Sequence, residues 1–243
     1  MLSATLLLLL VLVLWSDHTF VHGQLVVNQC PQGVRPRREI RALSTQERQS
    51  FISAIQRLQR TGSPSRYDDF SQVHYDAREY AHGYSLFFPW HRYYIRLFET
   101  MLQEADANVM LPYWDWSLDS QAPGASVIFQ DNYMGGNGRE GDGCVVDGPF
   151  ANLQTAFPQP NCLTRNFDMS PNGNNAFYSP EMIQNTISST RDYAQFRNRI
   201  ESIPHGNVHN GIGGIMVSMY SSNDPIFFLH HAMVDRIWAM WQQ

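Results

Sequence analysis

The spacing of apolar residues predicts two helices in the first half of the chain. Ser44 followed by Glu47 is the pattern of a capping box, and the apolar residues after it recur on one helical face. This helix is expected to end before Gly62, which opens a Gly-Ser-Pro stretch. A second helix is predicted from near Pro89 to about Asp106, because proline is favoured in a first helical turn and apolar positions follow at helical spacing.

The middle of the chain lacks this periodicity. Residues 119–180 hold eight of the 16 glycines and six of the 13 prolines, which is typical of loops. Cys144 and Cys162 lie inside this stretch, and a bridge between them would contribute roughly 3 kcal/mol. Helical periodicity returns around residues 188–203, and a final helix is predicted to begin at Asp224–Pro225. The pattern therefore predicts a mainly α fold with long irregular loops.

The N-terminus carries a segment that is not expected to belong to the fold. Residues 6–14 form an unbroken aliphatic run, followed by polar residues and a small residue at Gly23. The run is too short to span a bilayer, so residues 1–23 are predicted to be a secretory signal peptide, with an uncleaved anchor as the alternative. Residues 24–243 are then expected to form one secreted domain, in a compartment where disulfides persist.

Composition and charge exclude several classes of protein. Hydrophobic residues make up 43% of the 243 residues and charged residues 16%, so the chain can bury a core and is not disordered. The formal net charge is −5, which argues against a nucleic-acid partner. No second apolar segment of membrane length follows the N-terminal run, so no membrane is expected as a partner after signal removal. The oligomeric state stays open.

Histidine carries the candidate chemistry. Seven histidines follow the signal segment, and they fall into two groups: His74, His82 and His91, and then His205, His209, His230 and His231. His205 and His209 are four residues apart, so a helix would present both imidazoles to one metal ion; a pair of surface histidines is the alternative for these two residues taken alone. His231 would complete a set of three. Consecutive helical residues lie about 100° apart, so His230 is expected to be a packed or hydrogen-bonded histidine.

The first group requires a break between its members. His82 and His91 are nine residues apart, which on one continuous helix would place them on opposite faces. Pro89 permits His82 to lie on a loop or preceding turn, with His91 in the first turn of the new helix. His74 would be the third member, although a half-exposed polar residue is the simpler interpretation of His74 taken alone.

Two sets of three imidazoles, without an interleaved cysteine or carboxylate, narrow the choice of metal. Imidazole suits copper, zinc and iron, and copper(II) binds most tightly in the divalent series. The iron facial triad would need a carboxylate, and the HExxH motif of many zinc hydrolases is absent from the sequence. Two metal ions roughly 3.5–4 Å apart hold a small ligand between them. A pair of copper ions in this arrangement suits dioxygen.

Five segments of the chain resemble the copper-binding motifs of the tyrosinase family. YDDFSQVH (67–74), AHGYSLFFPWHRYY (81–94) and LPYWDW (111–116) are similar to the first copper half-site, and PHGNVHNGIGG (204–214) and NDPIFFLHHAMVDRIWAMW (223–241) to the second. The resemblance implies a mainly α fold in which a four-helix bundle holds a dinuclear type-3 copper centre. It also implies that the domain spanning 24–243 is truncated at its C-terminus, because family members normally continue.

The resemblance implies a ligand set as well. Carried over by position, the first copper takes His74, His82 and His91, and the second takes His205, His209 and His231. Asp224 and Asp235 match acidic positions of the second motif, where one interpretation is that they orient ligating imidazoles. The other interpretation is a helix cap for Asp224 and an ion pair with Arg236 for Asp235.

The implied function is a copper phenol oxidase that acts on a phenolic small molecule and O2. It would oxidise o-diphenols to o-quinones; true tyrosinases also hydroxylate monophenols, a monooxygenase reaction. Many of them place Asn directly after the first ligand of the second site, whereas this chain has Gly206 there and Asn207 one position later. Monophenol hydroxylation is therefore less expected than diphenol oxidation. Some relatives also link a cysteine to an imidazole at a position where this chain has Tyr80, so no such thioether can form.

Two other functions are compatible with the same motifs. An oxygen carrier like the molluscan hemocyanins uses the same kind of site, but Tyr80 and the single short domain after a signal peptide argue against it. A secreted matrix protein that has kept the fold but lost catalysis would not need all six ligand positions, which this chain retains. The fold alone does not separate these functions.

Overall fold

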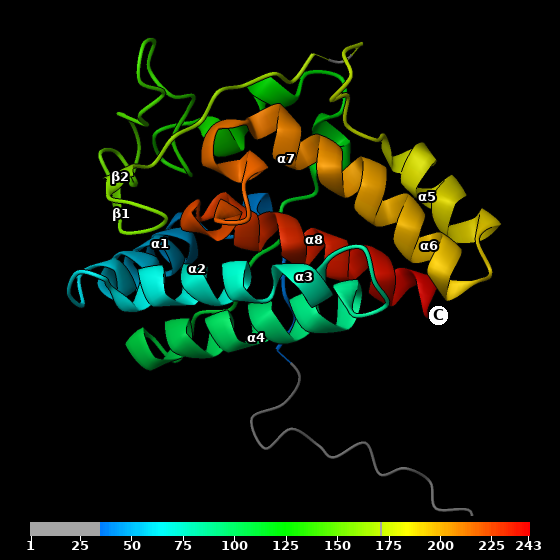
Figure 1. The fold of residues 1–243 in the computed structure, drawn as a ribbon, viewed down its shortest axis with the longest axis horizontal. Coiled ribbons are helices and arrows are strands. Elements are labelled where there is room, and N and C mark those ends of the chain that lie inside the picture. Colours follow the sequence, from blue (N-terminus) through cyan, green and yellow to red (C-terminus); the bar gives the residue numbers. More distant parts are fainter. Residues whose placement is uncertain (1–34, 171) are drawn as a thin grey trace, which may run out of the picture. The chain divides into compact units, whose positions relative to one another are not determined.

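Helices dominate the part of the chain that the computed structural model describes, residues 35–170 and 172–243 (Figure 1). The helices are α1 (Thr45–Gln59), α2 (Arg66–Asp76), α3 (Arg78–Ala81), α4 (Phe87–Ala105), α5 (Pro180–Ser189), α6 (Tyr193–Ile200), α7 (Gly206–Ile212) and α8 (Ile226–Trp241). The strands β1 (Gln154–Thr155) and β2 (Asn161–Cys162) form a short antiparallel pair. The predicted mainly α class is confirmed. The predicted signal peptide (1–23) and Cys30 lie outside the described residues.

Two capping boxes begin the first two long helices. The predicted box is present: the Glu47 backbone N–H donates to Ser44 Oγ over 3.2 Å, and the Ser44 N–H donates to the Glu47 carboxylate over 2.8 Å. Ser65 and Asp68 form a second reciprocal box at the start of α2. The sequence analysis predicted no helix there, although Ser-x-x-Asp is a variant of the same start signal.

Helix α4 begins two residues earlier than predicted, at Phe87. Pro89 is therefore the third residue of the helix, where a missing N–H costs nothing because the first-turn donors have no intrahelical partner. His91 consequently lies in the second turn and not in the first. The predicted break before it is confirmed, since His82 ends α3 in an extended conformation (φ −123°, ψ 145°) and Gly83 turns the chain with φ 76°.

The helical periodicity predicted around residues 188–203 is present, but it is divided between the end of α5, α6 and a π-helical turn. Helix α5 ends at Ser189 and α6 begins after Asp192, whose carboxylate accepts the Gln195 N–H over 2.9 Å and so caps a new helix. A π-helical turn, Glu201–His205, follows α6 and leads directly into α7. The final helix α8 begins at Ile226, close to the predicted Asp224–Pro225 start.

The core lies where α4 packs against α8. The rings of Phe98 and Phe228 are stacked with centroids 3.5 Å apart, and the ring of Phe70 on α2 is stacked on Tyr94 at 4.3 Å. The Tyr94 hydroxyl donates to the Phe70 carbonyl over 2.8 Å. Full burial of each such side chain contributes about 1.5–3 kcal/mol. Because the apolar faces of α2, α4 and α8 meet here, the polar residues on the same helices are held at fixed positions.

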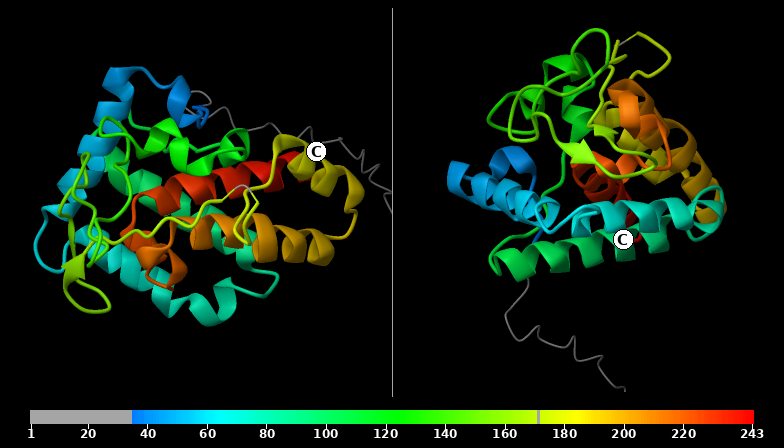
Figure 2. Two further views of the ribbon diagram at one scale, coloured as in Figure 1. Left: turned by 90° about the horizontal axis from the view of Figure 1, so that it is seen from above. Right: turned by 60° about the vertical axis from the view of Figure 1, so that its left-hand side comes forward.

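The irregular middle of the chain lies on the side of α8 away from α2 and α4 (Figure 2). Cys144 and Cys162 form a disulfide across it, as the sequence suggested. Gly213 and Gly214 have φ of 66° and 55°, and a Cβ on Gly213 would lie 2.2 Å from the Asn166 carbonyl oxygen. Only glycine therefore permits this close packing of the segment after α7 against the irregular middle. Among the described residues, no helix is long and apolar enough to cross a membrane.

Candidate metal centre

The first histidine cluster gathers residues from three elements. His74 lies on α2, His82 ends α3 and His91 lies on α4. The ring centroid of His74 lies 5.1 Å from that of His82 and 5.6 Å from that of His91. The ring centroids of His82 and His91 are 4.9 Å apart. One nitrogen of each ring lies within 4.8 Å of the others. The structure thus brings together the three residues predicted for the first copper.

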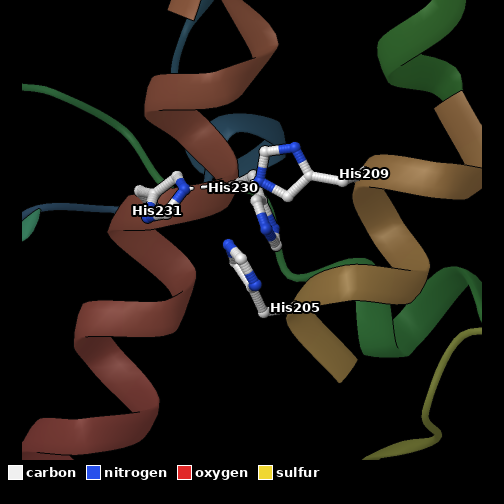
Figure 3. A group of neighbouring side chains, drawn as sticks. All are labelled: His205, His209, His230 and His231. Atoms are coloured by element: carbon white, nitrogen blue, oxygen red, sulfur yellow. Dashed lines mark hydrogen bonds between the residues drawn. The ribbon is translucent and has the colours of Figure 1, made fainter. Parts of the chain in front are cut away.

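The second cluster gathers four histidines from two neighbouring stretches of chain (Figure 3). His205 ends the π-helical turn and His209 follows on α7, with ring centroids 4.6 Å apart. His230 and His231 lie on α8, and one nitrogen of each of the four rings lies within 4.8 Å of the others. The predicted convergence of His205, His209 and His231 is present, and His230 joins them.

The two clusters touch through His91 and His231. Their rings are stacked, with centroids 4.3 Å apart and planes inclined by 12°. Phe87 and Phe227 also contact both clusters: Phe87 lies 4.9 Å from His91 and 5.0 Å from His205. Six predicted ligands therefore converge on one region of the molecule, lined by buried aromatic rings.

Backbone carbonyls fix the orientation of five imidazoles. In three rings the Nδ1–H donates a hydrogen bond to the backbone carbonyl four residues earlier. These bonds join His82 to Arg78 over 3.3 Å, His91 to Phe87 over 2.7 Å and His205 to Glu201 over 2.9 Å. A carbonyl oxygen can only accept, so Nδ1 is the protonated nitrogen in each ring. The other nitrogen, Nε2, is then left with its lone pair available for a metal ion.

The remaining two carbonyls come from the segment between α7 and α8. His74 Nδ1 donates to the Met219 carbonyl and His209 Nδ1 to the Met216 carbonyl, each over 2.7 Å. This segment therefore orients one imidazole in each cluster. The buried Nε2 atoms of His74, His91 and His205 have no hydrogen-bond partner among the described residues. Since a buried unpaired nitrogen costs free energy, these atoms fit metal ligation.

Burial keeps the imidazoles neutral. Desolvation lowers the pKa of His74 from its ordinary 6.5 to about 3 and that of His209 to about 4. It also lowers the pKa of His82, and it holds the pKa values of His91 and the other second-cluster rings well below 6.5. Metal ligation needs the neutral form, so these rings are ready to bind at physiological pH. Neutral nitrogen donors without thiolate or carboxylate suit copper.

The acidic residues of the second motif do not orient imidazoles. The Asp224 carboxylate accepts two hydrogen bonds from Arg165, over 2.7 and 3.0 Å, and both side chains are fully buried. It also accepts the N–H of Ile226, the first residue of α8, over 3.0 Å, although the N-cap residue of this helix is Pro225. Within the described chain neither Asp224 nor Asp235 hydrogen-bonds a histidine, and that interpretation is wrong because arginines occupy both carboxylates.

Asp235 has a different partner from the one expected. Its carboxylate accepts from Arg92, which follows His91 on α4, and from Arg37 over 3.2 Å. Arg37 in turn donates to both carboxylate oxygens of Glu99 over 3.1 Å. Arg236, the predicted partner, lies over the Tyr113 ring, 5.3 Å from its centroid. Residues so far apart in the sequence show no regular spacing that would pair them. The ion pair between Arg92 on α4 and Asp235 on α8 could therefore not be predicted from the sequence.

Gly206 leaves space beside the second cluster. It begins α7 directly after His205, and the nearest atom to a Cβ built there is the Glu201 carbonyl oxygen at 3.7 Å, an ordinary contact. Asn207 does not substitute for a side chain at that position, because its amide donates to the Ala176 carbonyl over 2.7 Å. Tyr80 is 49% exposed on α3 and lies outside the cluster of rings.

Comparisons with known proteins identify the family. The family described as the common central domain of tyrosinase matches residues 64–243. The chain is 36% identical to a tyrosinase of Streptomyces antibioticus over 83% of this chain and 81% of that protein. It is 35% identical to the tyrosinase-like protein phomQ1 of Diaporthe leptostromiformis over 91% of this chain and 66% of that protein. The chain thus spans slightly less than two thirds of this fungal relative.

Solved structures agree with this relationship. A polyphenol oxidase of Thermothelomyces thermophila (mutant G292N) superimposes with a TM-score of 0.75 at 28% identity, over 87% of this chain and 71% of that one. A functional unit of Octopus hemocyanin shares the fold, with a TM-score of 0.59 at 20% identity over 86% and 53% of the two chains. The chain belongs to the tyrosinase family, and its two histidine clusters make up the dinuclear type-3 copper centre of that family.

Proposed function

We propose that the protein is a copper-dependent oxidase that converts o-diphenols to o-quinones with O2. The observation that carries this proposal is the meeting of two sets of oriented, neutral imidazoles at the His91–His231 stack. The ligands of the first copper are His74, His82 and His91, and those of the second are His205, His209 and His231. The activities named for the relatives, tyrosinase and polyphenol oxidase, support the same reaction class.

The choice of His231 over His230 follows from the position of Nε2. The Nε2 atoms of His231 and His209 lie 3.4 Å apart (Figure 3). Two ligands about 2.0 Å from one tetrahedral ion are roughly 3.3 Å apart, so this spacing suits two ligands of one ion. The ring of His231 is also stacked on His91 of the first cluster, so an ion held by His231 lies on the side of the second cluster that faces the first.

The residues of this chain provide geometry and a dry environment. Bound copper supplies the electron transfer between the phenol and dioxygen. Nδ1–H hydrogen bonds fix five of the six proposed ligand rings, all except His231, and Phe87 and Phe227 exclude water from both clusters. His82 is the one proposed ligand in the described chain whose ring is partly exposed, so the phenol enters from the side where this ring reaches the surface.

Diphenol oxidation is proposed as the main activity because of Gly206. A side chain at this position would lie beside His205, where it could hold a water molecule that accepts the proton of a monophenol. Asn207 is occupied by its hydrogen bond to Ala176 and does not supply that group. A diphenol oxidase needs less help with deprotonation. Monophenol hydroxylation is the second candidate activity and requires another proton acceptor in the pocket.

Oxygen uptake by the copper-loaded protein tests the proposal, with catechol and then a monophenol as substrates. Uptake with catechol alone is the expected result, and copper-stripped protein is the control. The Gly206→Asn variant is the matched test, because a Cβ fits there; it should gain uptake with the monophenol. A folded, copper-bound protein that consumes no oxygen with either substrate would instead support an oxygen carrier or a matrix protein.

We also propose that the mature protein is secreted. The aliphatic run at residues 6–14 and the Cys144–Cys162 disulfide both support this, since disulfides persist in oxidising compartments. Expression in animal or fungal cells, followed by N-terminal sequencing of protein from the medium, tests it. A mature N-terminus near residue 24 is expected, and retention in the cell would contradict the proposal.

A further inference from the structure

His230 is the one histidine of the second cluster to which the proposed function gives no role. Its side chain is fully buried, and neither ring nitrogen has a hydrogen-bond partner among the described residues. By contrast, His205 and His209 each have Nδ1 fixed by a carbonyl. Leaving a buried polar nitrogen unpaired costs about 1–3 kcal/mol, so a ligand bound to one nitrogen of this ring would remove one of these costs.

The position of the ring shows what that ligand is. His230 is stacked on His205, with centroids 5.2 Å apart and planes inclined by 19°, and lies edge-on to His209 at 4.9 Å. One of its nitrogens lies within 4.8 Å of a nitrogen on each of His205, His209 and His231. Figure 3 shows the four rings around one space, so His230 borders the position of the second metal ion.

His230 and His231 approach this space from different sides. His231 is stacked on His91 of the first cluster, at 4.3 Å. His230 has no ring contact with the first cluster in the described chain, and its outer neighbour is Trp116 at 6.2 Å. An ion that shifts away from the first cluster therefore moves toward His230 while it keeps its other nitrogen ligands.

We propose that the second cluster also binds a single metal ion in a closed mode, with His230 as a fourth imidazole ligand beside His205, His209 and His231. In the closed mode the second cluster holds an ion while the first cluster is empty. When both clusters hold an ion, the second ion is bound by His205, His209 and His231 alone. This proposal rests on the ligand assignment given above. Four neutral nitrogen donors within 4.8 Å of one another suit an ion with a filled d shell, such as zinc(II) or copper(I), which favours tetrahedral coordination.

Zinc is the probe that tests this, because it binds without redox chemistry. The metal-free protein, given one equivalent of zinc, is studied by X-ray absorption at the zinc edge, which counts imidazole ligands. Four nitrogen ligands at about 2.0 Å are expected. Three nitrogens with one water oxygen would overturn the proposal. This measurement uses the natural chain, so it decides the question even if variants fail to fold.

Substitutions locate the zinc ion. His230→Gln should weaken zinc binding in a chelator competition by about 10- to 100-fold, and His230→Phe, which keeps a ring in the same space, should do the same. His82→Gln, in the first cluster, should leave the zinc affinity unchanged. Equal zinc affinity in His230→Gln and the natural protein, or a loss in His82→Gln, would contradict the closed mode. Oxygen uptake with copper is measured separately, so failure of the oxidase proposal and failure of the closed mode are distinguishable.

Discussion

The first cluster draws three imidazoles from three separate elements, whereas the second draws four from two short stretches of chain. His82 of the first cluster is partly exposed, and its Nδ1 hydrogen bond to the Arg78 carbonyl is 3.3 Å long. In the second cluster His205, His230 and His231 are buried. The first cluster therefore depends on the packing of α2, α3 and α4, while local geometry forms most of the second.

This difference indicates that the two half-sites do not hold metal equally well. A ligand at the end of a four-residue helix, next to a glycine turn, is less restrained than one on a sixteen-residue helix in the core. We expect the second cluster to bind first and release last. The predictions below test this comparison, beginning with the largest expected effect.

The largest effect is expected where the two clusters touch. His231→Gln removes a proposed ligand of the second ion and the ring that stacks on His91. Oxygen uptake with catechol should fall by about 10³-fold, because a metal supplies several kcal/mol of barrier lowering. Metal analysis should find at most one copper per chain, and circular dichroism confirms folding. Normal uptake in this variant would mean that His230 is the ligand.

Two acidic residues on and before α8 should differ in their effect on stability. Asp224→Asn leaves fully buried Arg165 without its charged partner and should lower the free energy of unfolding by about 3–5 kcal/mol. Asp235→Asn should cost less, about 1–2 kcal/mol, because this carboxylate is 17% exposed and its arginine partners reach solvent. Urea unfolding of both variants gives the comparison. Equal losses would show that burial does not decide the outcome.

Acid should destabilise the metal-free protein. In the unfolded chain a histidine protonates near pH 6.5, but burial lowers the pKa of His209 to about 4 and that of His74 to about 3 in the folded protein. Between these values the unfolded state binds more protons, so stability falls as the pH decreases below 6.5. Each such histidine should contribute about 1.4 kcal/mol per pH unit. Thermal unfolding between pH 7 and pH 5 measures this; a flat profile would contradict it.

The smallest effect concerns the rate of metal loss. Under a chelator, one copper per chain should leave about tenfold faster than the other, with the faster ion coming from the first cluster, where His82 is partly exposed. Metal analysis over time separates the two phases. His82→Gln is the matched control and should show only the slow phase. Loss of both ions at one rate would remove the distinction between the clusters.

The sequence predicted the parts of the site that depend on local spacing. The break between His82 and His91, the pair His205–His209 and the capping box at Ser44 all follow from helical geometry or from the chemistry of helix ends. The choice of metal followed from the donor types. Each of these arguments uses residues within ten positions of each other, over which the backbone fixes direction.

Long-range contacts set the limit of that prediction. The partners of Asp224 and Asp235 are Arg165, Arg92 and Arg37, and no pattern in the sequence connects them. The carbonyls that orient the rings belong to the backbone, which every residue has, so no residue type in the sequence marks them. The π-helical turn before His205 was also missed, because Pro204 there looks like a helix break. Tertiary packing decides these features, so they became visible only in the structure.

The segment between α7 and α8 limits where this chain can change in length. Its two methionine carbonyls hold one imidazole in each cluster, and Gly213 and Gly214 press it against residues 164–166. A single inserted residue between Gly214 and Met216 would shift both carbonyls relative to these glycines and so misalign both half-sites. Insertions near Gly141 in the exposed loop meet no such restriction. Length variation among natural or designed relatives should therefore accumulate around that loop and spare the thirteen residues between Ile212 and Ile226.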